Sequence, residues 1–345
     1  MLRFPPSAVP TSFLKPLDAL LYPGACLFAA SLPKPGCAPD EKPLVVRPGG
    51  LGDLVCADIA LQELGRDARD FLWLIERRSQ PWAAYRGLTH LCYDAGFTAT
   101  LARIRGRHAL VINSEQFFGL AQATALLARS RRGRLVSFET VRGAPWADST
   151  VPYDWDATHE TVSFARLFGA ALDLPEPLKP VRPRRRAYLA SAPPLVLVAG
   201  RQSPSRRLDL DSWVALIAKW CRDRSFEIAA APEDDAFAAQ LGSRFKKASR
   251  FTGSFEALCE RIARSEEVFT VDGGGVHIAS YFGVPALAVF TSGRDRKWHP
   301  LGEGSRILRR HDLPCQPCTK FGQVPPCPNA YACLKLDDVE PKPVW

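Results

Sequence analysis

The stretch Val268–Pro300 constrains the fold of this chain more than any other part of the sequence. A short apolar run ends at Asp272 and is followed by Gly273, Gly274 and Gly275, a helical segment and a second apolar run. This pattern predicts a strand, a glycine turn, a helix and a strand, which together make one βαβ unit. Glycines at such a junction let the backbone approach a ligand and expose N–H groups that favour a phosphate. A tight turn without a ligand is the alternative, because glycine-rich turns between strands and helices are common.

A second unit of strand, glycine loop and helix begins near residue 44. The apolar run Leu44–Val46 leads into the loop RPGGLGD, and a helix is predicted from Leu54 to Leu64. The loop has neither the spacing of a P-loop nor that of a dinucleotide-binding fingerprint. Asp53 stands where the loop meets the helix, and a carboxylate there caps the helix or acts as a general base. The residues alone favour capping and leave the general base open.

Strands and helices alternate through both halves of the sequence, which predicts parallel α/β sheets. The stretch Leu174–Pro194 is rich in proline and arginine and keeps no apolar period, so it is the predicted linker region. A helix predicted at Phe13–Leu21 is expected to pack on a domain, with contact to a membrane face as the alternative. The predicted parts are an extension with this short helix (1–41), a Rossmann-like acceptor domain (42–180), a linker (181–194), a Rossmann-like nucleotide-sugar domain (195–312) and a cysteine-rich loop with the tail (313–345).

Composition limits the classes of partner. Hydrophobic residues make up 46% and charged residues 23% of the chain, as in globular proteins. The net charge of +9 suits nucleic acid, an anionic membrane surface or a phosphorylated substrate. The chain has no basic run with interleaved aromatic residues, so we expect no nucleic acid. The apolar segment Ala19–Leu32 is similar to a secretory signal, but Asp18 and Pro23 interrupt it, and no apolar run is long enough to span a membrane.

Charged residues gather at the predicted strand ends of the second half. Arg201, Arg206 and Arg207 follow one strand, Glu233 follows another, and Asp272 precedes the glycine turn. Because the carboxyl ends of parallel strands share one edge of a sheet, we expect these side chains to lie close together. Guanidinium forks hold phosphates and a carboxylate holds ribose hydroxyls, so this edge is predicted to bind a nucleotide diphosphate.

The first half offers candidates for the other substrate. Glu115 and Gln116 follow a predicted strand, and Gly50 and Gly52 lie in the glycine loop. These residues are the acceptor-side candidates, because ligands bind outside the carboxyl ends of strands in open α/β sheets. A polar loop without a ligand is the alternative reading of Glu115 and Gln116.

Four of the ten cysteines cluster near the C-terminus in a proline-rich loop. Four thiolates on a short, stiff loop close a tetrahedral zinc or iron site, so we expect a structural metal there. Free thiols or an incidental disulfide are the alternative, and the six scattered cysteines are expected to be buried and reduced. The predicted metal ligands are Cys315, Cys318, Cys327 and Cys333.

Taken together, these motifs resemble glycosyltransferase family 9, the ADP-heptose:lipopolysaccharide heptosyltransferases. The resemblance runs from Leu14 to the C-terminus. It implies an α/β GT-B fold, in which two Rossmann-like domains face each other across a cleft, and it implies no cofactor for catalysis. The segments that carry it, in order, are VVRPGGLGDLVCADIALQEL, SPSRRLDLDSW, APEDDAFAAQL, VDGGGVHIASYFGVPALAVF and RDRKWHPLG.

The resemblance also implies roles for individual residues. Asp53 matches the aspartate proposed as general base, and Glu233 matches the glutamate that contacts the nucleoside. Arg206 stands where the family has a lysine for the donor phosphates, an exchange that keeps the charge and changes its geometry. Gly273 stands where a serine or threonine is usual, which leaves one hydrogen bond to the donor in doubt. The donor site corresponds to Asp272, Gly273, Gly274, Gly275 and His277.

The function that the resemblance implies is transfer of a heptose or related sugar, with inversion, from ADP-heptose to a hydroxyl of the lipopolysaccharide core. The alternatives are the same fold acting on a protein or another glycan, and a nucleotide-sugar-binding module without catalysis. The expected location is the cytoplasm, with peripheral contact to the anionic inner face of the membrane.

Overall fold

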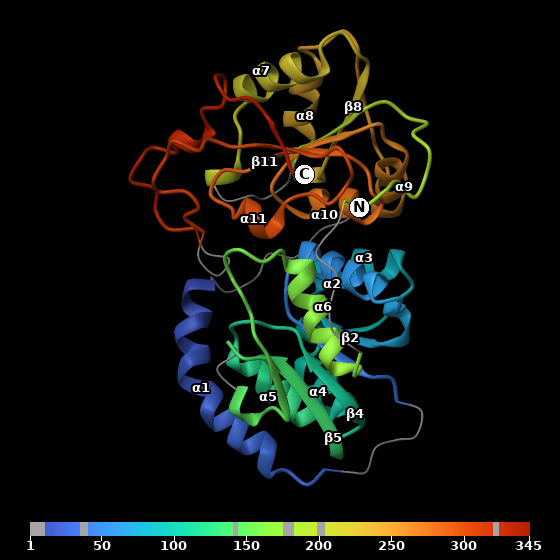
Figure 1. The fold of residues 1–345 in the computed structure, drawn as a ribbon, viewed down its shortest axis with the longest axis vertical. Coiled ribbons are helices and arrows are strands. Elements are labelled where there is room, and N and C mark those ends of the chain that lie inside the picture. The colour runs from blue at the N-terminus through green and yellow to red at the C-terminus, as the bar shows by residue number, and fades with distance from the viewer. Residues whose placement is uncertain (1–10, 35–40, 141–143, 175–182, 199–203, 320–323) are drawn as a thin grey trace. The chain divides into compact units, whose positions relative to one another are not determined.

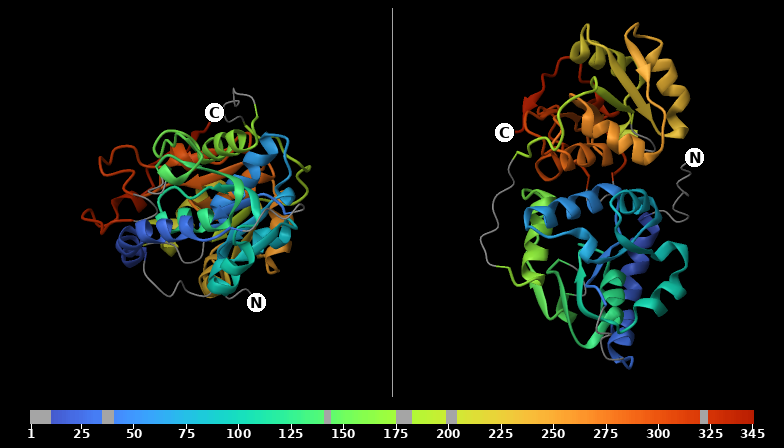
Figure 2. Two further views of the ribbon diagram at one scale, coloured as in Figure 1. Left: turned by 90° about the horizontal axis from the view of Figure 1, so that it is seen from below. Right: turned by 90° about the vertical axis from the view of Figure 1, so that its right-hand side faces the viewer.

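The structure, a computed structural model, describes residues 11–34, 41–140, 144–174, 183–198, 204–319 and 324–345. The chain forms two compact units, Phe4–Pro180 and Val181–Trp345, which we call the N-terminal and the C-terminal unit. Figures 1 and 2 show the ribbon from three sides. Within the described ranges no helix combines the length and the apolar content needed to cross a bilayer.

The N-terminal unit is built on a parallel sheet. Its described strands follow the order β3-β2-β1-β4-β5-β6, so the strand order reverses between β1 and β4. Such a reversal leaves a crevice at the carboxyl ends of the two strands, where open α/β sheets bind ligands. The strands are β1 (Leu44–Arg47), β2 (Leu72–Ile75), β3 (Thr89–Cys92), β4 (His108–Asn113), β5 (Arg129–Phe138) and β6 (Ser149–Val151).

Helices cover both faces of this sheet. One face packs against α1, α4 and α5 through small and branched apolar side chains such as Ala125, Leu126 and Val111. On the other face α2 packs on α6, and Trp73 of β2 meets Phe168 of α6 edge to face. The helices are α1 (Thr11–Ser31), α2 (Leu51–Glu63), α3 (Gln80–Tyr85), α4 (Phe97–Ile104), α5 (Gly119–Ala128) and α6 (Glu160–Ala171).

Helix α1 is longer than the sequence predicts. The expected piece was Phe13–Leu21, whereas the helix continues through Pro23 to Ser31. Its second half buries Cys26 and Ala29 against the unit. This packing outweighs the loss of one backbone hydrogen bond at the proline, which is why propensity alone misjudged the end of the helix.

The C-terminal unit repeats the same plan. Its described strands follow the order β13-β12-β11-β10-β7-β8-β9, and all pair in parallel except β13. The strand order reverses between β7 and β10, the strand that precedes the glycine turn. The strands are β7 (Leu195–Val198), β8 (Phe226–Ala230), β9 (Ala248–Arg250), β10 (Val268–Val271), β11 (Ala286–Val289), β12 (Arg306–Leu308) and β13 (Lys342–Pro343).

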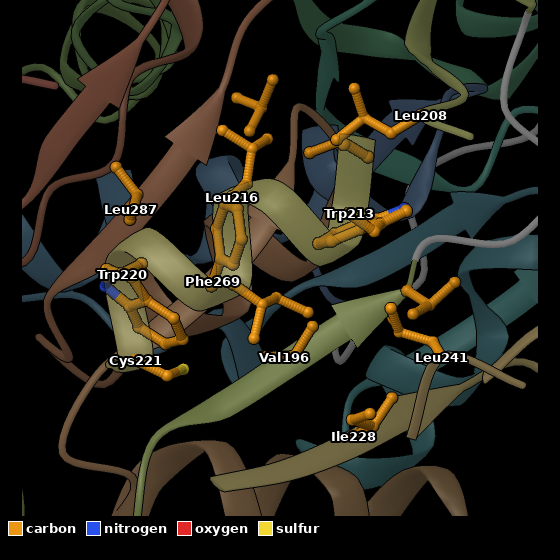
Figure 3. Packing of buried hydrophobic residues seen from close by; sticks show 14 of the residues in the cluster. Val196, Leu208, Trp213, Leu216, Trp220, Cys221, Ile228, Leu241, Phe269 and Leu287 are labelled. Carbon is orange, nitrogen blue, oxygen red and sulfur yellow. The ribbon is translucent and has the colours of Figure 1, made fainter. Parts of the chain in front are cut away.

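The main core of this unit lies between the sheet and α7. Figure 3 shows the side chains of α7 gathered over those of β7, β10 and β11, with Trp213 and Trp220 on either side of Phe269. On the opposite face, Val276 of α10 packs with Ala288 and Phe290. The helices are α7 (Leu210–Cys221), α8 (Asp235–Gly242), α9 (Phe255–Arg264), α10 (Gly274–Tyr281) and α11 (Asp295–Trp298).

The described part of the proline- and arginine-rich stretch is attached to the C-terminal unit. The backbone N–H of Arg184 donates to the carbonyl of Leu301, and that of Ala187 donates to Phe282. Gly283 has a positive φ, and a Cβ there would meet the carbonyl oxygen of Arg185 at 2.0 Å. Residues 183–194 therefore pack as part of this unit.

Candidate active site

Asp53 lies in the first turn of α2, six residues after β1 ends. The backbone N–H of Gly50 donates to its Oδ2 at 3.1 Å, so the carboxylate closes the start of the helix. The side chain is 25% exposed. The carboxylate caps the helix and is still partly exposed, so its capping role does not exclude the general base that the sequence leaves open. Gly52 lies in the same turn and is half-buried.

Arg47, the last residue of β1, organises the surroundings of Asp53. Its guanidinium is buried, and Nη2 lies 3.4 Å from Asp53 Oδ1 and 3.5 Å from Glu115 Oε2. Burial opposes the charge of Arg47, but the carboxylates of Asp53, Glu115 and Glu160 outweigh it and raise the pKa of Arg47. Arg47 was placed in the glycine loop by the sequence analysis and was given no role. Its position at the end of a buried strand was the signal that would have found it.

Gly49 leaves the space in which the Arg47 guanidinium lies. A Cβ at this position would stand 2.3 Å from Arg47 Nη2 and 2.7 Å from Nε. Neither atom can be that close to a carbon, so a side chain at Gly49 forces the guanidinium to move. The glycine loop therefore serves the arrangement of side chains as well as the backbone.

Glu115 and Gln116 are buried within a network around Arg47. Gln116 Oε1 accepts from Arg47 Nη1 at 3.3 Å, and Gln116 Nε2 donates to Glu160. Tyr153 donates to the other oxygen of Glu160 at 2.9 Å. Burial raises the pKa of Glu115, although Arg47 and the N–H groups of two following residues oppose this. Both residues hold Arg47 in this structure, and their contact with an acceptor stays a prediction.

Asp272 follows β10 at the carboxyl edge of the second sheet. It is buried, and its Oδ2 lies 3.3 Å from Arg206 Nη2. Burial raises the pKa of Asp272, and the neighbouring Arg206 charge opposes the rise. A Cβ at Gly293, in the loop after β11, would stand 2.0 Å from this Oδ2. Gly293 thus makes room for the carboxylate, a role that no sequence pattern indicated.

The glycine turn starts α10. Gly273 precedes the helix with an extended backbone, so its conformation is open to any residue. A Cβ at Gly275 would meet Leu197 Cδ1 of β7 at 2.8 Å, so this glycine allows the helix to lie close to the strand. Gly274 begins the helix. His277 is buried, and its ring meets that of Trp298 edge to face at 5.5 Å.

The other donor-side candidates lie on the same sheet edge. Arg207 and Glu233 are exposed, and both charges act on Asp234. Burial raises the pKa of Asp234, with Arg207 opposing the rise and Glu233 adding to it. The three side chains therefore form one charged group beyond β7 and β8. Asp234 was not among the residues predicted for the donor site. Arg201 lies outside the described residues.

The comparisons with known proteins decide the family. The model of glycosyltransferase family 9 (heptosyltransferase) matches residues 155–327, which is half of the chain. The chain belongs to this family. It is therefore a glycosyltransferase, as the sequence motifs predicted. No curated protein matches the sequence.

Solved structures agree with the family. Heptosyltransferase WaaC of E. coli with ADP has a TM-score of 0.61 at 15% identity, over 77% of this chain and 92% of that one. A glycosyltransferase family 9 protein of Veillonella parvula has a TM-score of 0.61 at 13% identity, over 78% and 85%. The E. coli ADP-heptose lipopolysaccharide heptosyltransferase II has a TM-score of 0.58 at 14% identity, over 79% of this chain and 91% of that one. At these identities the likeness concerns the fold, and the predicted GT-B fold class is confirmed.

The cysteine cluster of this family 9 chain lies in a loop beside the C-terminal sheet. Cys315, Cys318, Cys327 and Cys333 line one small cavity of about 40 Å³, together with Ser205. Burial raises the pKa of Cys333 to about 11, and the three other thiols add to the shift. The described His, Cys, Asp and Glu residues form no group of three or more that could hold a metal ion. The predicted metal therefore stays a prediction.

Hydrogen bonds join the cysteine-rich loop to the donor-side loops. Ser205, in the turn that holds Arg206, donates to Ser292 at 2.8 Å, and the N–H of Thr319 donates to the Ser292 carbonyl at 3.0 Å. The charge of Arg206 also reaches Cys318. The loop therefore supports the segment that carries Arg206.

The larger cavity described in the C-terminal unit, about 460 Å³, lies away from these residues. Glu267, Arg224 and Trp220 line it, near the amino ends of the strands. Ligands bind at the carboxyl ends of parallel strands in this type of sheet, so the larger volume does not make this cavity the active site.

Proposed function

We propose that the protein is an inverting heptosyltransferase, which moves a heptose or a related sugar from ADP-heptose to a hydroxyl of the lipopolysaccharide core. The observation that carries the proposal is the partly exposed carboxylate of Asp53, fixed by Gly50 and Arg47 at the carboxyl edge of the first sheet. A carboxylate in a fixed position that a substrate can reach is suited to general base catalysis.

In this proposal Asp53 takes the proton of the acceptor hydroxyl. The hydroxyl oxygen forms a bond to the anomeric carbon, and the bond from that carbon to the diphosphate oxygen breaks. The electron pair leaves with ADP. Arg206, Arg207 and the backbone N–H groups that start α10 stabilise the departing diphosphate. The exposed Glu233 takes the ribose hydroxyls.

Arg206 suits this role because, among the described residues, its ion-pair partner is one buried carboxylate. Asp272 lies 3.3 Å away, and one of the guanidinium's other nitrogens, Nε, is buried without a described hydrogen-bond partner. A diphosphate brings more negative charge and more acceptor atoms than one carboxylate, so it satisfies this guanidinium better.

The proposal includes contact with the anionic inner face of the membrane, because a lipopolysaccharide acceptor is anchored in lipid. It also includes a structural zinc or iron ion at the four cysteines. The small cavity that the four cysteines share supports the metal. Bound metal would join two parts of a loop that has little apolar core of its own. The ion takes no part in the transfer step.

The test is to incubate the purified protein with ADP-heptose and a heptose-free lipopolysaccharide core, and to measure the product by mass spectrometry. Addition of one heptose, with the configuration at the anomeric carbon inverted, is the expected result. Thermal-shift titration with a panel of nucleotide sugars identifies the donor independently of the acceptor. Donor binding without transfer to any core, protein or other glycan acceptor would favour the binding module instead.

A further inference from the structure

Helix α1 is fixed to the N-terminal unit by one of its faces. Both oxygens of the buried Asp18 accept the first N–H groups of α5, from Gly119 at 2.9 Å and from Leu120 at 2.8 Å. Tyr22 fills the space beside Gly119, where a Cβ would meet its ring at 2.5 Å. Cys26 and Ala29 are buried in the same interface. These contacts attach α1 to the unit beside α5, as Figure 1 shows.

The opposite side of α1 is apolar and exposed. The exposed fractions are 76% for Leu20, 58% for Leu27 and 64% for Phe28. A Cβ at Gly24, between them, would have no atom within 4 Å. Positions three, four and seven apart lie on one side of a helix, so these residues form one stripe. We call this stripe the α1 face: Leu17, Leu20, Leu21, Leu27 and Phe28.

No exposed charge interrupts the α1 face. From Pro16 to Ser31 Asp18 is the only charged residue, and its side chain points to α5. A helix that is apolar on both sides is normally buried on both sides, because water solvates neither. The five residues of the α1 face are also almost half of the eleven large apolar side chains exposed in the described structure. This concentration indicates a surface that is covered in the working protein.

Cations contact the segment that follows α1, and two more follow Arg129 on β5. Lys34 donates to the carbonyl of Leu126 at 2.7 Å, and Arg105 donates to the carbonyl of Pro33 at 3.2 Å. The charge of Arg129, at the start of β5, reaches Lys34. Asp148 is the carboxylate that pairs with Arg129. Arg131 and Arg132, two and three residues farther along β5, are exposed. We call Lys34, Arg105, Arg131 and Arg132 the basic end.

We propose that the α1 face and the basic end together form a docking surface for an anionic phospholipid bilayer. The apolar side chains enter the boundary between headgroups and acyl chains, and the cations meet the lipid phosphates. A second copy of the chain is the competing occupant. It would cover the apolar stripe, but it would bring the same excess of cations and no exposed carboxylate on α1 to neutralise them.

This inference rests on the membrane contact within the proposed function, yet its test contains no sugar donor or acceptor. The full-length protein is centrifuged with vesicles of phosphatidylcholine, alone or with about one third phosphatidylglycerol. We expect sedimentation with the anionic vesicles and little with the neutral ones. The double variant Leu20→Glu/Phe28→Glu should reduce binding at least about tenfold, since it places two carboxylates in the apolar boundary.

Two further variants separate the contributions. Leu189→Glu is the matched control, because Leu189 is 90% exposed in the C-terminal unit and lies outside the α1 face. It should bind vesicles like the wild type. Arg131→Gln/Arg132→Gln should weaken binding to anionic vesicles and leave the weak binding to neutral vesicles unchanged. All three positions are exposed, so each variant should keep the circular dichroism spectrum and thermal midpoint of the wild type.

The proposal is overturned if the wild type stays in the supernatant with anionic vesicles, or if Leu20→Glu/Phe28→Glu binds as well as Leu189→Glu. A wild type that is dimeric by analytical ultracentrifugation, with a monomeric Leu20→Glu/Phe28→Glu variant and no vesicle binding, would assign the α1 face to a second copy. Loss of sugar transfer with vesicle binding intact would refute the proposed function alone.

Discussion

The guanidinium of Arg47 lies 3.4 Å from the carboxylate of Asp53 and 3.5 Å from that of Glu115. One buried cation thus faces two carboxylates, of which only Asp53 is reachable from solvent. If Asp53 takes a proton from an acceptor, as proposed, Arg47 keeps Glu115 as its partner and is not left unpaired. Substitutions at Asp53, or at Gly49 beside the guanidinium, should therefore reduce activity.

Replacing Asp53 with Asn should abolish turnover while leaving the fold intact. The amide keeps the shape of the side chain and loses the ability to accept a proton, so we expect a fall in kcat of about 10²- to 10⁴-fold. Donor binding, measured by the thermal shift with ADP, should match the wild type because the predicted donor residues lie in the other unit. Turnover within threefold or so of the wild type would remove Asp53 from its role as base.

Gly49→Ala should reduce activity through Arg47. The added Cβ would stand 2.3 Å from Arg47 Nη2, so the guanidinium must shift, and its 3.4 Å contact with Asp53 is disturbed. A displacement of this kind costs about 10²-fold in rate when the group orients a catalytic residue. Gly96→Ala is the matched control, since a Cβ at Gly96 would meet no atom within 4 Å. Equal activity of the two variants would show that the position of Arg47 does not matter.

The alternation of strands and helices in both halves was predicted from the sequence. The stretch Val268–Pro300 begins with a strand, a glycine turn, a helix and a second strand, as predicted. The short strands β3, β6 and β12 were not predicted, because each has three or four residues and carries little pattern of its own. Their strand conformation depends on pairing with neighbours, which a single sequence does not display.

The site was predicted in part. Glycines and carboxylates at strand ends pointed to Asp53 and Asp272, since the edge of a parallel sheet is fixed by topology. Arg47 and Gly293 were missed as contacts of these carboxylates. Each lies next to its carboxylate because of the conformation of a loop. Such a contact leaves no periodic pattern in the sequence. Family resemblance supplied roles for residues that share a motif, and it was silent about these two supporting positions.

Stability should depend on pH through Asp272. Burial raises the pKa of Asp272 above its unfolded value, so between the two values the folded protein holds a proton that the unfolded chain lacks. The free energy of unfolding therefore falls as pH rises through this window. The variant Asp272→Asn lacks this titrating group. Its free energy of unfolding should therefore fall less than that of the wild type when pH is raised from below the window to above it. The measurement is urea denaturation of both proteins without donor.

Asp209→Asn is a control of opposite sign. Asp209 accepts the N–H of Ser212 at the start of α7, which lowers the pKa of Asp209. The stability that ionised Asp209 contributes is present above its unfolded pKa and is lost as pH falls through its folded pKa. Asparagine caps a helix about as well as aspartate, so the variant removes the charge and keeps the cap. If the free energy of unfolding falls with rising pH as much in Asp272→Asn as in the wild type, the role assigned to Asp272 is contradicted.

Cys318→Ser should release the proposed metal and loosen the loop that supports Arg206. A serine hydroxyl is a poor substitute for a thiolate ligand, so elemental analysis after anaerobic purification should find about one zinc or iron per wild-type chain and far less in the variant. Cys318 and Ser205 line the same cavity, and Ser205 precedes Arg206, so donor affinity should fall together with the thermal midpoint. Cys92→Ser is the matched control, because Cys92 is also half-buried but lies on β3 of the other unit. Wild-type protein without bound metal, combined with equal thermal midpoints for the two variants, would leave the cluster as four reduced thiols.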